Sequence, residues 1–390
     1  MKRRRICVVS GSRADYGILF PVLSELKSSS KIDLQLIVTG SHLSPEFGLT
    51  VKEIEADGFE IAKKVEILMS SDTDVGVAKS MGLGLIEFGP VLNDLSPDIV
   101  MLLGDRFELM AVAATALVLA IPIAHIHGGE TTRAAFDEAI RHSITKMAHI
   151  HFTATEEYRR RVIQLGESPD RVFNVGAPGL DNIRALDPVS RQELEHLLGL
   201  SFDRRTILVT WHPVTLEPGT SVVDFGEILT ALDRNPGLNV IFTKANADNE
   251  GREINQAIDE FVKKNSVRAV VVASMGRRMY WSVLMNIDCV LGNSSSGIIE
   301  APSAGIPTIN IGARQEGRIR ASSVVDCPPV AVDIEKAIAV VMSDECESVI
   351  DPASNPYDQG GASELISEAV SSVDTTALIK KHFYDLPRSD

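Results

Sequence analysis

The sequence predicts an α/β protein with two doubly wound, Rossmann-like parallel sheets, one in each half of the chain. Short apolar segments recur along the chain, segments of helical composition separate them, and the alternation starts again after a polar stretch at residues 190–198. Strands separated by helices form parallel sheets that are buried on both faces. A chain of 390 residues also suits two domains better than one hydrophobic core.

The first half is expected to form a domain over residues 1–180. It starts with a strand at 5–10 and a helix at about 16–27. Asp137, Arg141 and His142 are expected to fall within two turns of a further helix. The remaining elements follow in the same alternation. Strands are expected at 34–38, 99–103, 121–124, 151–155 and 171–175, and helices at 51–57, 73–95, 108–119 and 156–165.

The second half is expected to form a domain over residues 181–370. Its strands are expected at 206–210, 239–243, 268–273, 288–291 and 307–311, and its helices at 222–232, 252–264, 278–285 and 297–305. The tail shows helical patterns at 363–373 and 375–382. We expect the segment 371–390 to be a C-terminal helix that packs back toward the N-terminal domain.

Composition favours a soluble protein that binds no nucleic acid. The net charge of −15 argues against nonspecific nucleic-acid binding, which needs a basic surface. The basic start is followed by too short an apolar run for a signal peptide, and the apolar stretch 111–124 falls short of the roughly 20 residues of a membrane-spanning helix. The cysteines, Cys7, Cys289, Cys327 and Cys346, have no metal-ligand spacing. We therefore expect a cytoplasmic protein with reduced thiols and no metal site.

Polar residues follow several strands of the first half, where ligands bind in open α/β sheets. Asp105 and Arg106 follow one strand and Glu130 the next, so we expect these side chains and Asp137 to converge on one edge of a cleft. Arg13 stands in a strand–glycine–helix junction suited to an anion, although it could be only a solvated loop residue. His42 also follows a strand, where a lone histidine is more often structural than catalytic.

The strand ends of the second half are polar as well. They carry His212, Asn246, Met275, Ser294, Ser295 and Arg314, and Glu300 lies in the helix that the serine run opens. Free helix N–H groups, hydroxyls and glycines suit phosphate, whereas the structural alternative is that Ser294 only caps the helix. There is no dinucleotide fingerprint and no Walker loop.

These two sets of residues suit a nucleotide sugar. A diphosphate would lie against the serine run of the second half, and the sugar would face Asp105, Glu130 and Asp137. Without a metal motif, chemistry at the sugar must use acid and base groups, and one carboxyl of a crowded set can have its pKa raised enough to move a proton.

Seven motifs in order resemble the hydrolysing UDP-N-acetylglucosamine 2-epimerases of bacterial sialic acid synthesis, and the resemblance covers roughly the whole chain. They are Gly-Ser-Arg13-Ala-Asp-Tyr, Gly40-Ser-His42-Leu, Gly104-Asp105-Arg106-Phe, His125-Ile-His-Gly-Gly-Glu130, Asp137-Glu-Ala-Ile-Arg141-His142-Ser-Ile-Thr-Lys, His212-Pro-Val-Thr and Gly292-Asn-Ser-Ser-Ser-Gly297. The resemblance implies the fold of GT-B glycosyltransferases, with the active site in the interdomain cleft. It implies elimination of UDP to a 2-acetamidoglucal, then hydration to N-acetylmannosamine, without metal, NAD or another cofactor, in a homodimer or homotetramer.

The resemblance also assigns roles by position. Asp105, Glu130 and Asp137 match the acid/base carboxylates, and His212 matches the histidine near the diphosphate. Arg13 and Arg106 match residues that contact the nucleotide sugar, and His42, within a matching motif, is counted among the substrate-binding residues. The UDP pocket is matched by Asn246, Met275 (by its backbone), Ser294, Ser295, Glu300 and Arg314. One departure is His127, where the non-hydrolysing relatives and the animal bifunctional enzyme carry glutamate.

Three alternatives stay open. The same motifs occur in the hydrolysing epimerase of UDP-2,4-diacetamido-2,4,6-trideoxyglucose in legionaminic acid synthesis, and nothing in this sequence distinguishes the C4 and C6 substituents. A glycosyltransferase of the same fold is disfavoured by the three carboxylates. A noncatalytic nucleotide-sugar sensor would need no such carboxylates.

Overall fold

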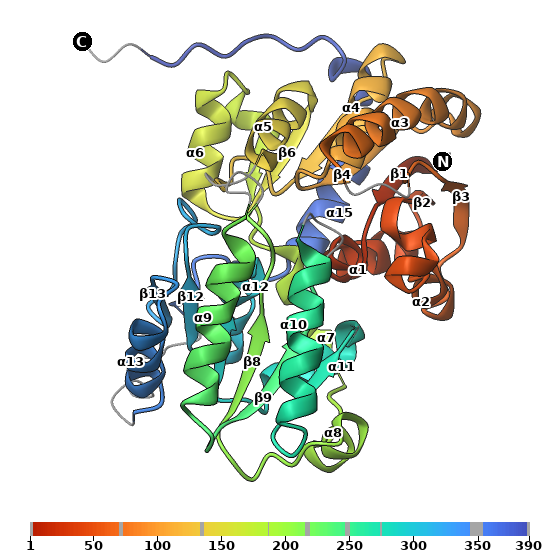
Figure 1. The fold of residues 1–390 in the computed structure, drawn as a ribbon. Coiled ribbons are helices and arrows are strands. Elements are labelled where there is room, and N and C mark those ends of the chain that lie inside the picture. The colour runs from red at the N-terminus through yellow and green to blue at the C-terminus, as the bar shows by residue number, and fades with distance from the viewer. Residues whose placement is uncertain are drawn as a thin grey trace. The chain divides into compact units, whose positions relative to one another are not determined.

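The computed structural model describes residues 3–69, 73–132, 136–185, 187–214, 219–245, 250–273, 275–343 and 354–387. The chain divides into two compact units, whose elements Figure 1 labels. Unit 1 comprises Met1–Glu130, Asp137–Asn182 and Gln359–Asp390, and unit 2 comprises Thr131–Phe136 and Ile183–Asp358. The domain limits 1–180, 181–370 and 371–390 stay predictions.

Unit 1 contains a seven-stranded sheet in which all paired strands are parallel. The strands are β1 (Arg4–Ser10), β2 (Ile32–Thr39), β3 (Ile61–Val65), β4 (Ile99–Leu103), β5 (Ile123–Ile126), β6 (Ile150–Thr153) and β7 (Val172–Asn174). Their order is β3-β2-β1-β4-β5-β6-β7, so the direction of winding reverses between β1 and β4. In open α/β sheets, ligands bind at such a switch point.

Some helices of unit 1 begin where a short polar side chain caps them. Ser12 accepts a hydrogen bond from Asp15 N before α1, and Thr155 accepts one from Tyr158 N before α6. The helices are α1 (Arg13–Ser28), α2 (Val51–Ala56), α3 (Asp74–Leu95), α4 (Phe107–Val118), α5 (Asp137–Met147), α6 (Glu156–Gln164) and α15 (Ala362–Ser372). Short 3₁₀ turns are η1 (Gly40–Leu43), η2 (Pro45–Phe47), η3 (Pro169–Arg171), η4 (Pro178–Leu180) and η7 (Thr375–Ala377).

Unit 2 contains a six-stranded sheet, again parallel throughout. Its strands are β8 (Thr206–Thr210), β9 (Asn239–Thr243), β10 (Ala269–Val272), β11 (Cys289–Gly292), β12 (Thr308–Ile311) and β13 (Val324–Cys327). The order β10-β9-β8-β11-β12-β13 places the switch point between β8 and β11. Its helices are α8 (Arg191–Leu198), α9 (Ser221–Asp233), α10 (Gly251–Lys264), α11 (Gly276–Leu284), α12 (Ser295–Ile299) and α13 (Ala331–Val341), with η5 (Ala301–Ala304); α7 (Asp181–Ala185) links the two units.

The two predicted parallel sheets are confirmed, but the sequence pattern does not predict β3, β13 or α13. Both strands lie at sheet edges. The sequence of β3, IAKKV, carries two lysines, and β13 carries Asp326, so neither reads as a buried apolar run. Charged residues are common on edge strands because they prevent pairing with another chain. β5 is also displaced, because it begins after Pro122 and extends to Ile126.

Two predicted helices are wrong in part. The helix expected at 297–305 ends at Ile299, because Pro302 has no N–H to continue it, and a 3₁₀ turn follows. The helix expected at 375–382 forms only the turn Thr375–Ala377. Beyond that turn, residues 381–387 have no regular structure, and tertiary contacts hold part of this segment.

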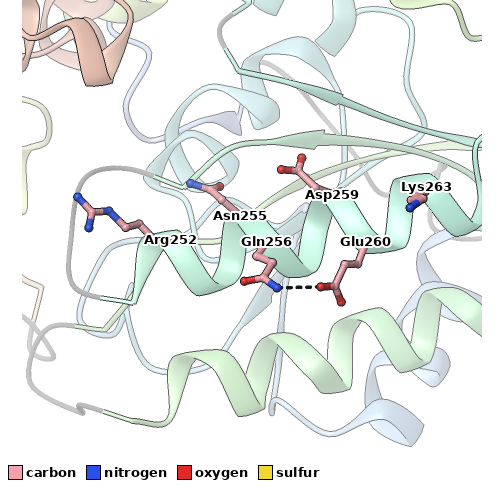
Figure 2. Close-up of a pocket in the computed structure, with 6 residues that line it drawn as sticks. All are labelled: Arg252, Asn255, Gln256, Asp259, Glu260 and Lys263. Atoms are coloured by element: carbon pink, nitrogen blue, oxygen red, sulfur yellow. Dashed lines mark hydrogen bonds between the residues drawn. The ribbon is translucent and has the colours of Figure 1, made fainter.

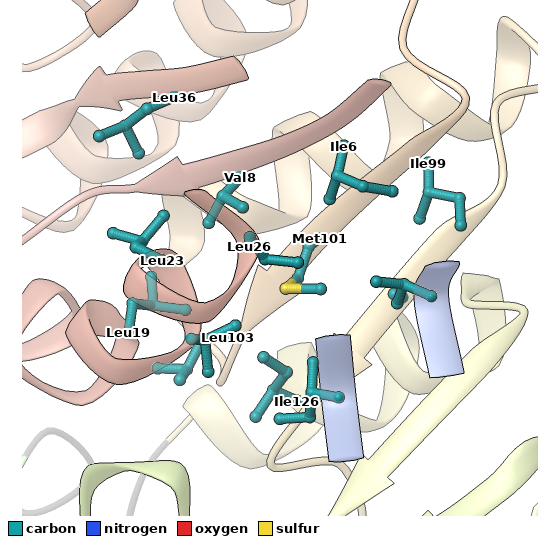
Figure 3. Close-up of a cluster of buried hydrophobic side chains, with 14 of the residues drawn as sticks. Ile6, Val8, Leu19, Leu23, Leu26, Leu36, Ile99, Met101, Leu103 and Ile126 are labelled. Carbon is teal, nitrogen blue, oxygen red and sulfur yellow. The ribbon is translucent and has the colours of Figure 1, made fainter. Parts of the chain in front are cut away.

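The core of unit 1 lies on both faces of its sheet. Figure 3 shows one face, where Val8 and Met101 pack with Leu19, Leu23 and Leu26 of α1. Burial of each such side chain contributes about 1.5–3 kcal/mol to the free energy of unfolding. Ile366 and Val370 of α15 belong to the same cluster. The C-terminal helix is therefore part of the core of unit 1, although it follows the whole of unit 2 in sequence.

One described helix, α3, is long and apolar enough to cross a membrane by length and composition alone. One of its glycines lies at a close helix–helix contact. A Cβ added at Gly84 would lie 2.9 Å from Cβ of Ala111, so this glycine allows α3 to pack closely on α4.

The described cysteines, Cys7, Cys289 and Cys327, are free and buried. Burial raises the pKa of Cys7 to about 12 and that of Cys327 to about 11. Since the thiolate is the reactive form, neither thiol is suited to nucleophilic chemistry. Cys346 lies outside the described residues.

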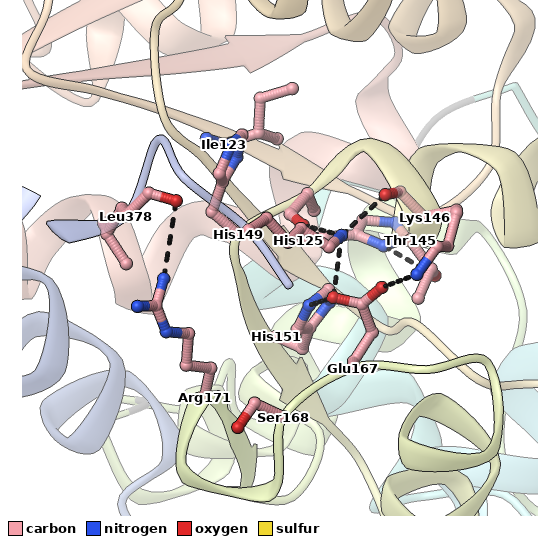
Figure 4. A network of polar contacts seen from close by, with 12 residues as sticks. Ile123, His125, Thr145, Lys146, His149, His151, Glu167, Ser168, Arg171 and Leu378 are labelled. Carbon is pink, nitrogen blue, oxygen red and sulfur yellow. Dashed lines mark hydrogen bonds and ion pairs between the residues drawn. The ribbon is translucent and has the colours of Figure 1, made fainter. Parts of the chain in front are cut away.

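A buried ionic network ties the C-terminal segment to unit 1, and Figure 4 shows its centre. Glu167 accepts from Nζ of Lys146 and Nζ of Lys381, both at 2.7 Å, and lies 3.0 Å from Nε2 of His151. Lys381 also donates to the carbonyls of Lys146 and Ala148. Burial raises the pKa of Glu167, but the hydrogen bonds from His151 and the lysines outweigh it and lower that pKa to about 2.

Glu167→Gln is expected to lower the free energy of unfolding by about 3 kcal/mol, because it leaves two lysines beside an uncharged, buried partner. Urea unfolding of the full chain measures this value. Glu156→Gln is the matched control: it removes a half-exposed carboxylate of unit 1 that pairs with Arg159, and should cost less than about 1 kcal/mol. Equal effects of the two variants would show that the network adds nothing to stability.

Candidate active site

Several of the candidate residues follow the strands at the switch point of each sheet. In unit 1, Arg13 follows β1, and Asp105 and Arg106 follow β4, the two strands between which the winding reverses. In unit 2, His212 follows β8, and Ser294 follows β11, which are again the two strands at the switch point. Each unit therefore presents its predicted site residues where doubly wound sheets bind ligands.

Arg141 joins two of the three predicted carboxylate residues. Its side chain is 2% exposed, it forms an ion pair with Asp105, and its Nη1 donates to the carbonyl of Glu130 at 2.9 Å. A buried guanidinium needs such partners, because an unpaired charge in the interior is costly. The sequence analysis placed Arg141 on the helix but did not include it among the site residues.

Glu130 is held at its side chain as well. Its Oε1 makes a short contact with Nδ1 of His127, and both residues are buried. The turn that carries them is tight: Gly129 has φ +81°, and a Cβ there would lie 2.5 Å from the carbonyl oxygen of Tyr158. Only glycine fits at position 129, so this glycine of the motif is required by the backbone conformation of the turn.

Asp137 is the first residue of α5 and is half-buried. It precedes Arg141 by four residues, and residues so spaced share one face of a helix. The third predicted carboxylate therefore lies on the helix face that anchors the other two. His142, on the same helix, is half-buried and lies 3.7 Å from Glu138, and burial lowers its pKa.

Two further acidic residues, Glu108 and Asp15, lie near Arg106, and they were not identified from the sequence. Arg106 forms an ion pair of 3.2 Å with the fully buried Glu108. Asp15 is buried nearby, and its burial raises the pKa of its carboxyl to about 6, although Arg106 opposes this effect. A Cβ at Gly40, which has φ +59°, would lie 2.8 Å from Glu108, so this glycine makes room for the pair.

His42 is fully buried, with both ring nitrogens engaged. Nε2 lies 2.9 Å from Oγ of Ser10, and Nδ1 lies 2.7 Å from Oγ1 of Thr50. Burial lowers the pKa of His42 to about 4, so the ring is neutral at pH 7. A direct contact of His42 with substrate stays a prediction.

His125 fixes the loop that carries Asp105. Its Nε2 lies 2.8 Å from the carbonyl oxygen of Gly104, which can only accept, so Nε2 carries the hydrogen. Nδ1 then accepts from Oγ1 of Thr145 at 3.1 Å. Burial lowers the pKa of His125 to about 3, which keeps the ring neutral.

The buried histidines predict a loss of stability in acid. His42 and His125 have folded-state pKa values of about 4 and about 3, below the unfolded value of about 6.5. Their contribution is therefore complete above about pH 6.5 and is lost as the pH falls toward those values. Urea unfolding at pH 7.5, 6 and 5 should show a free energy of unfolding that decreases by several kcal/mol. A midpoint independent of pH would contradict this expectation, and His42→Asn should reduce the slope by about one proton.

Asn293 organises the site residues of unit 2. It is fully buried, its Oδ1 accepts from the backbone N of His212 at 2.8 Å, and its Nδ2 donates to the His212 carbonyl at 2.7 Å. The carbonyl of Asn293 accepts from Arg314 at 3.0 Å and from Gln315 at 2.8 Å. One asparagine thus holds the segments of His212, the serine run and Arg314 together.

The serine run is shaped by the glycines on either side of it. Gly292 has φ +139°, and a Cβ there would lie 2.0 Å from the carbonyl oxygen of Thr210. A Cβ at Gly297 would lie 2.7 Å from Thr308. Ser294 caps α12 by accepting from Ser296 N, while Ser295 is half-buried at the first position of the helix. Ser294 therefore caps the helix, as the structural alternative expected. Its hydroxyl oxygen retains a second lone pair that is available to another hydrogen-bond donor.

The other predicted residues of unit 2 lie around this run. Glu300 follows α12 and lies close enough to Tyr280 that both burial and the Glu300 charge raise the pKa of Tyr280. Met275 is buried and directly precedes Gly276, whose φ is +61°. Asn246 lies outside the described residues. Among the residues that the structure describes, no group of three or more histidine, cysteine or acidic side chains has the arrangement of a metal site.

A surface hollow of about 410 Å³ lies elsewhere, along one face of α10 (Figure 2). Its lining comes from a single helix and is charged or amide throughout: Arg252, Asn255, Gln256, Asp259, Glu260 and Lys263. None of the candidate site residues lines it. Ligand sites are usually apolar concavities with a few polar groups, so we assign no role to this hollow.

Comparison with known proteins agrees with this arrangement. The sequence profile of one family, UDP-N-acetylglucosamine 2-epimerase, matches residues 24–371. The chain is 39% identical over 387 residues to GDP/UDP-N,N'-diacetylbacillosamine 2-epimerase (hydrolyzing) of Campylobacter jejuni, covering 99% of this chain and 100% of the relative. It is 39% identical over 389 residues to polysialic acid biosynthesis protein P7 of Escherichia coli, covering 98% of each chain.

The fold is shared with solved structures. The crystal structure of UDP-GlcNAc 2-epimerase from Neisseria meningitidis bound to UDP-GlcNAc has a TM-score of 0.81 against this chain at 19% identity, covering 94% of this chain and 99% of that one. At this identity the likeness concerns the fold. It confirms the expected pair of parallel α/β domains of GT-B-like type.

Proposed function

Because the chain belongs to the UDP-N-acetylglucosamine 2-epimerase family, we propose that it is a hydrolysing 2-epimerase of a UDP-2-acetamido sugar. In the proposed reaction, the proton at C2 is removed and the C1–O bond to UDP breaks, which gives a 2-acetamidoglucal. Water then adds at C1, and a proton returns to C2 on the opposite face. The products are free UDP and the 2-epimeric sugar.

One observation carries this proposal on the side of the sugar chemistry, namely the arrangement of acidic groups around Arg141. The carboxylate of Asp105 and the backbone carbonyl of Glu130 are fixed to the same guanidinium, and Asp137 starts the helix that presents it. A rigid acid/base set of this kind is what proton transfer at a carbon requires, because a group must lie within hydrogen-bond reach of the proton that it moves. A binding protein without catalysis would have no need for it.

The diphosphate is assigned to unit 2. Backbone N–H groups at the start of α12, with Arg314 fixed by Asn293, would take the negative charge of UDP. His212, held through its backbone by the same asparagine, would stabilise or protonate the leaving UDP. The residues proposed to bind the nucleotide are Asn246, Met275, Ser294, Ser295, Glu300 and Arg314, and Arg13, His42 and Arg106 are proposed for the sugar nucleotide on the side of unit 1.

For the sugar, UDP-N,N'-diacetylbacillosamine is our first candidate and UDP-GlcNAc the second. The Campylobacter relative is named for the first sugar and is aligned over essentially the whole chain. The Escherichia coli relative, equally identical, is named for polysialic acid biosynthesis, which favours UDP-GlcNAc and N-acetylmannosamine as its product. The Campylobacter name includes both GDP and UDP, so the base of the nucleotide must be tested as well.

The decisive assay compares UDP-N,N'-diacetylbacillosamine, its GDP counterpart and UDP-GlcNAc as substrates of the purified full chain. We expect release of free nucleotide and of the 2-epimeric sugar from the first, with a kcat/KM at least tenfold above that for UDP-GlcNAc. The reverse preference would support the sialic acid assignment. Nucleotide release that depends on an added acceptor would instead indicate a glycosyltransferase of the same fold.

We further propose that the reaction needs no metal and no NAD, and that the enzyme is a cytoplasmic homodimer or homotetramer. Turnover should be unchanged after dialysis against EDTA. A loss of activity that Mg²⁺ or Mn²⁺ restored would contradict the metal-free proposal. Light scattering on the purified chain measures the oligomeric state.

A further inference from the structure

We propose that Nε2 of His127 is the atom that removes the C2 proton in this enzyme, and that Glu130 acts as its orienting partner. This inference rests on the proposed function. It reverses the simplest assignment, in which Glu130 itself takes the proton and His127 only occupies a turn.

Within the part of the chain that the structure describes, the imidazole ring of His127 is paired with a carboxylate on one side only. Nδ1 of His127 contacts Oε1 of Glu130. A carboxylate oxygen accepts a hydrogen bond, so in the neutral ring Nδ1 carries the hydrogen and Nε2 carries the lone pair. A carboxylate on Nδ1 with the free lone pair on Nε2 is the arrangement in which histidine acts as a general base in catalytic triads.

Among the described residues, Nε2 of His127 is a buried nitrogen without a hydrogen-bond partner. The residue as a whole is 7% exposed. A buried polar nitrogen without a partner costs about 1–3 kcal/mol, so such atoms call for an explanation. By contrast, both ring nitrogens of the neighbouring His125 are engaged. A substrate C–H needs no permanent protein partner on the nitrogen that receives its proton.

The backbone of His127 is strained. His127 has φ +64°, in the left-handed region that histidine occupies at a cost of about 1–2 kcal/mol. Glycine would adopt this conformation without strain, yet the sequence places an imidazole there. The strained backbone is held by a hydrogen bond of 2.9 Å from His127 N to the carbonyl of Phe152. Strain of this kind is retained at sites where the position of a side chain matters more than stability.

Glu130 is better placed to orient than to react. Its side chain is almost fully buried, its Oε1 is engaged by His127, and its carbonyl is held by Arg141. In the elimination, the C2–H electron pair becomes the second bond between C1 and C2, and the C1–O electron pair leaves with UDP. The proton stays on Nε2, and Glu130 stabilises the resulting imidazolium until the proton exchanges with water.

The test is chemical rescue of His127→Gly, since glycine suits φ +64° and leaves space for a free base. We expect nucleotide release from the preferred sugar nucleotide to fall about 10³-fold in this variant. Adding imidazole at roughly 50–100 mM should restore the rate of release at least tenfold. The wild-type protein with the same imidazole is the control and should be unaffected. His127→Asn, which also tolerates a left-handed backbone but leaves no cavity, should lose the same activity without rescue.

The outcomes separate this inference from the proposed function. Activity of His127→Gly within threefold of the wild type, or a loss that imidazole does not restore while UDP still binds, would overturn the role of His127 alone. Failure of the wild-type protein to release nucleotide from any of the three sugars would overturn the proposed function, and this inference with it.

Discussion

Arg141→Met is expected to reduce kcat/KM for the preferred sugar nucleotide about 10³-fold or more, with UDP binding retained. Methionine replaces the length of the side chain but not its charge. It leaves the half-buried Asp105 without its ion pair and the carbonyl of the buried Glu130 without its donor. Breaking a buried ion pair from one side costs about 3–5 kcal/mol, and losing the position of a reacting group by 1 Å can cost about 10²-fold.

The control for this prediction is Arg160→Met. Arg160 is also an arginine of unit 1, but its side chain is 77% exposed and its pair with Glu156 is on the surface. The Arg160→Met substitution should leave kcat/KM and the unfolding temperature unchanged. Calorimetry with UDP separates the two expected effects, because UDP is assigned to unit 2. An Arg141→Met protein that is folded, binds UDP and turns over within tenfold of the wild type would contradict the arrangement.

Gly292→Ala is expected to abolish UDP binding and to destabilise unit 2 by more than about 4 kcal/mol. The new Cβ would lie 2.0 Å from the carbonyl oxygen of Thr210, which is backbone and cannot rotate away. The φ of +139° adds strain for any L-residue. Moving either strand would displace Asn293, and with it the backbone of His212 and the carbonyl that holds Arg314.

Gly226→Ala is the matched control in the same unit. Gly226 lies within α9, and a Cβ there would meet nothing within 4 Å. It should raise the free energy of unfolding by about 0.5–1 kcal/mol and leave UDP affinity unchanged. Thermal unfolding and UDP calorimetry measure both variants. A Gly292→Ala protein with wild-type UDP affinity would show that the serine run is not the nucleotide site.

The central strands were predictable because each is a buried apolar run that a glycine or a polar residue ends. β4, β8 and β11 appear close to the expected positions for this reason. The edge strands were not predictable in the same way, since β3 contains two adjacent lysines and β13 contains Asp326. The order of strands, and hence the two switch points, follows from tertiary pairing and not from local pattern.

The residues that carry charge at the strand ends were predictable, and those that hold them in place were not. Asp105 and His212 follow apolar strands, which is a local signal. Arg141 and Asn293 act through contacts with residues 36 and 81 positions away, and no local pattern encodes such contacts. For Arg141, a usable signal was its spacing of four residues from Asp137, which places both on one helix face.

His127 shows a different limit of sequence reasoning. Its place in the motif identifies it as a departure from the glutamate of related enzymes, which raises a question about Glu130. The left-handed backbone and the unpartnered Nε2, found only in the structure, turn that question into a specific assignment of base and orienting group.

The central claim is that the carbon next to the anomeric centre loses and regains its proton while UDP leaves. Incubating the full chain with the preferred UDP-2-acetamido sugar in deuterated water, and examining the released sugar by proton NMR and mass spectrometry, tests it most directly. The account predicts one deuterium at C2 of a sugar with the epimeric configuration, together with one equivalent of UDP. A released sugar that keeps its original hydrogen and configuration at C2 would contradict it.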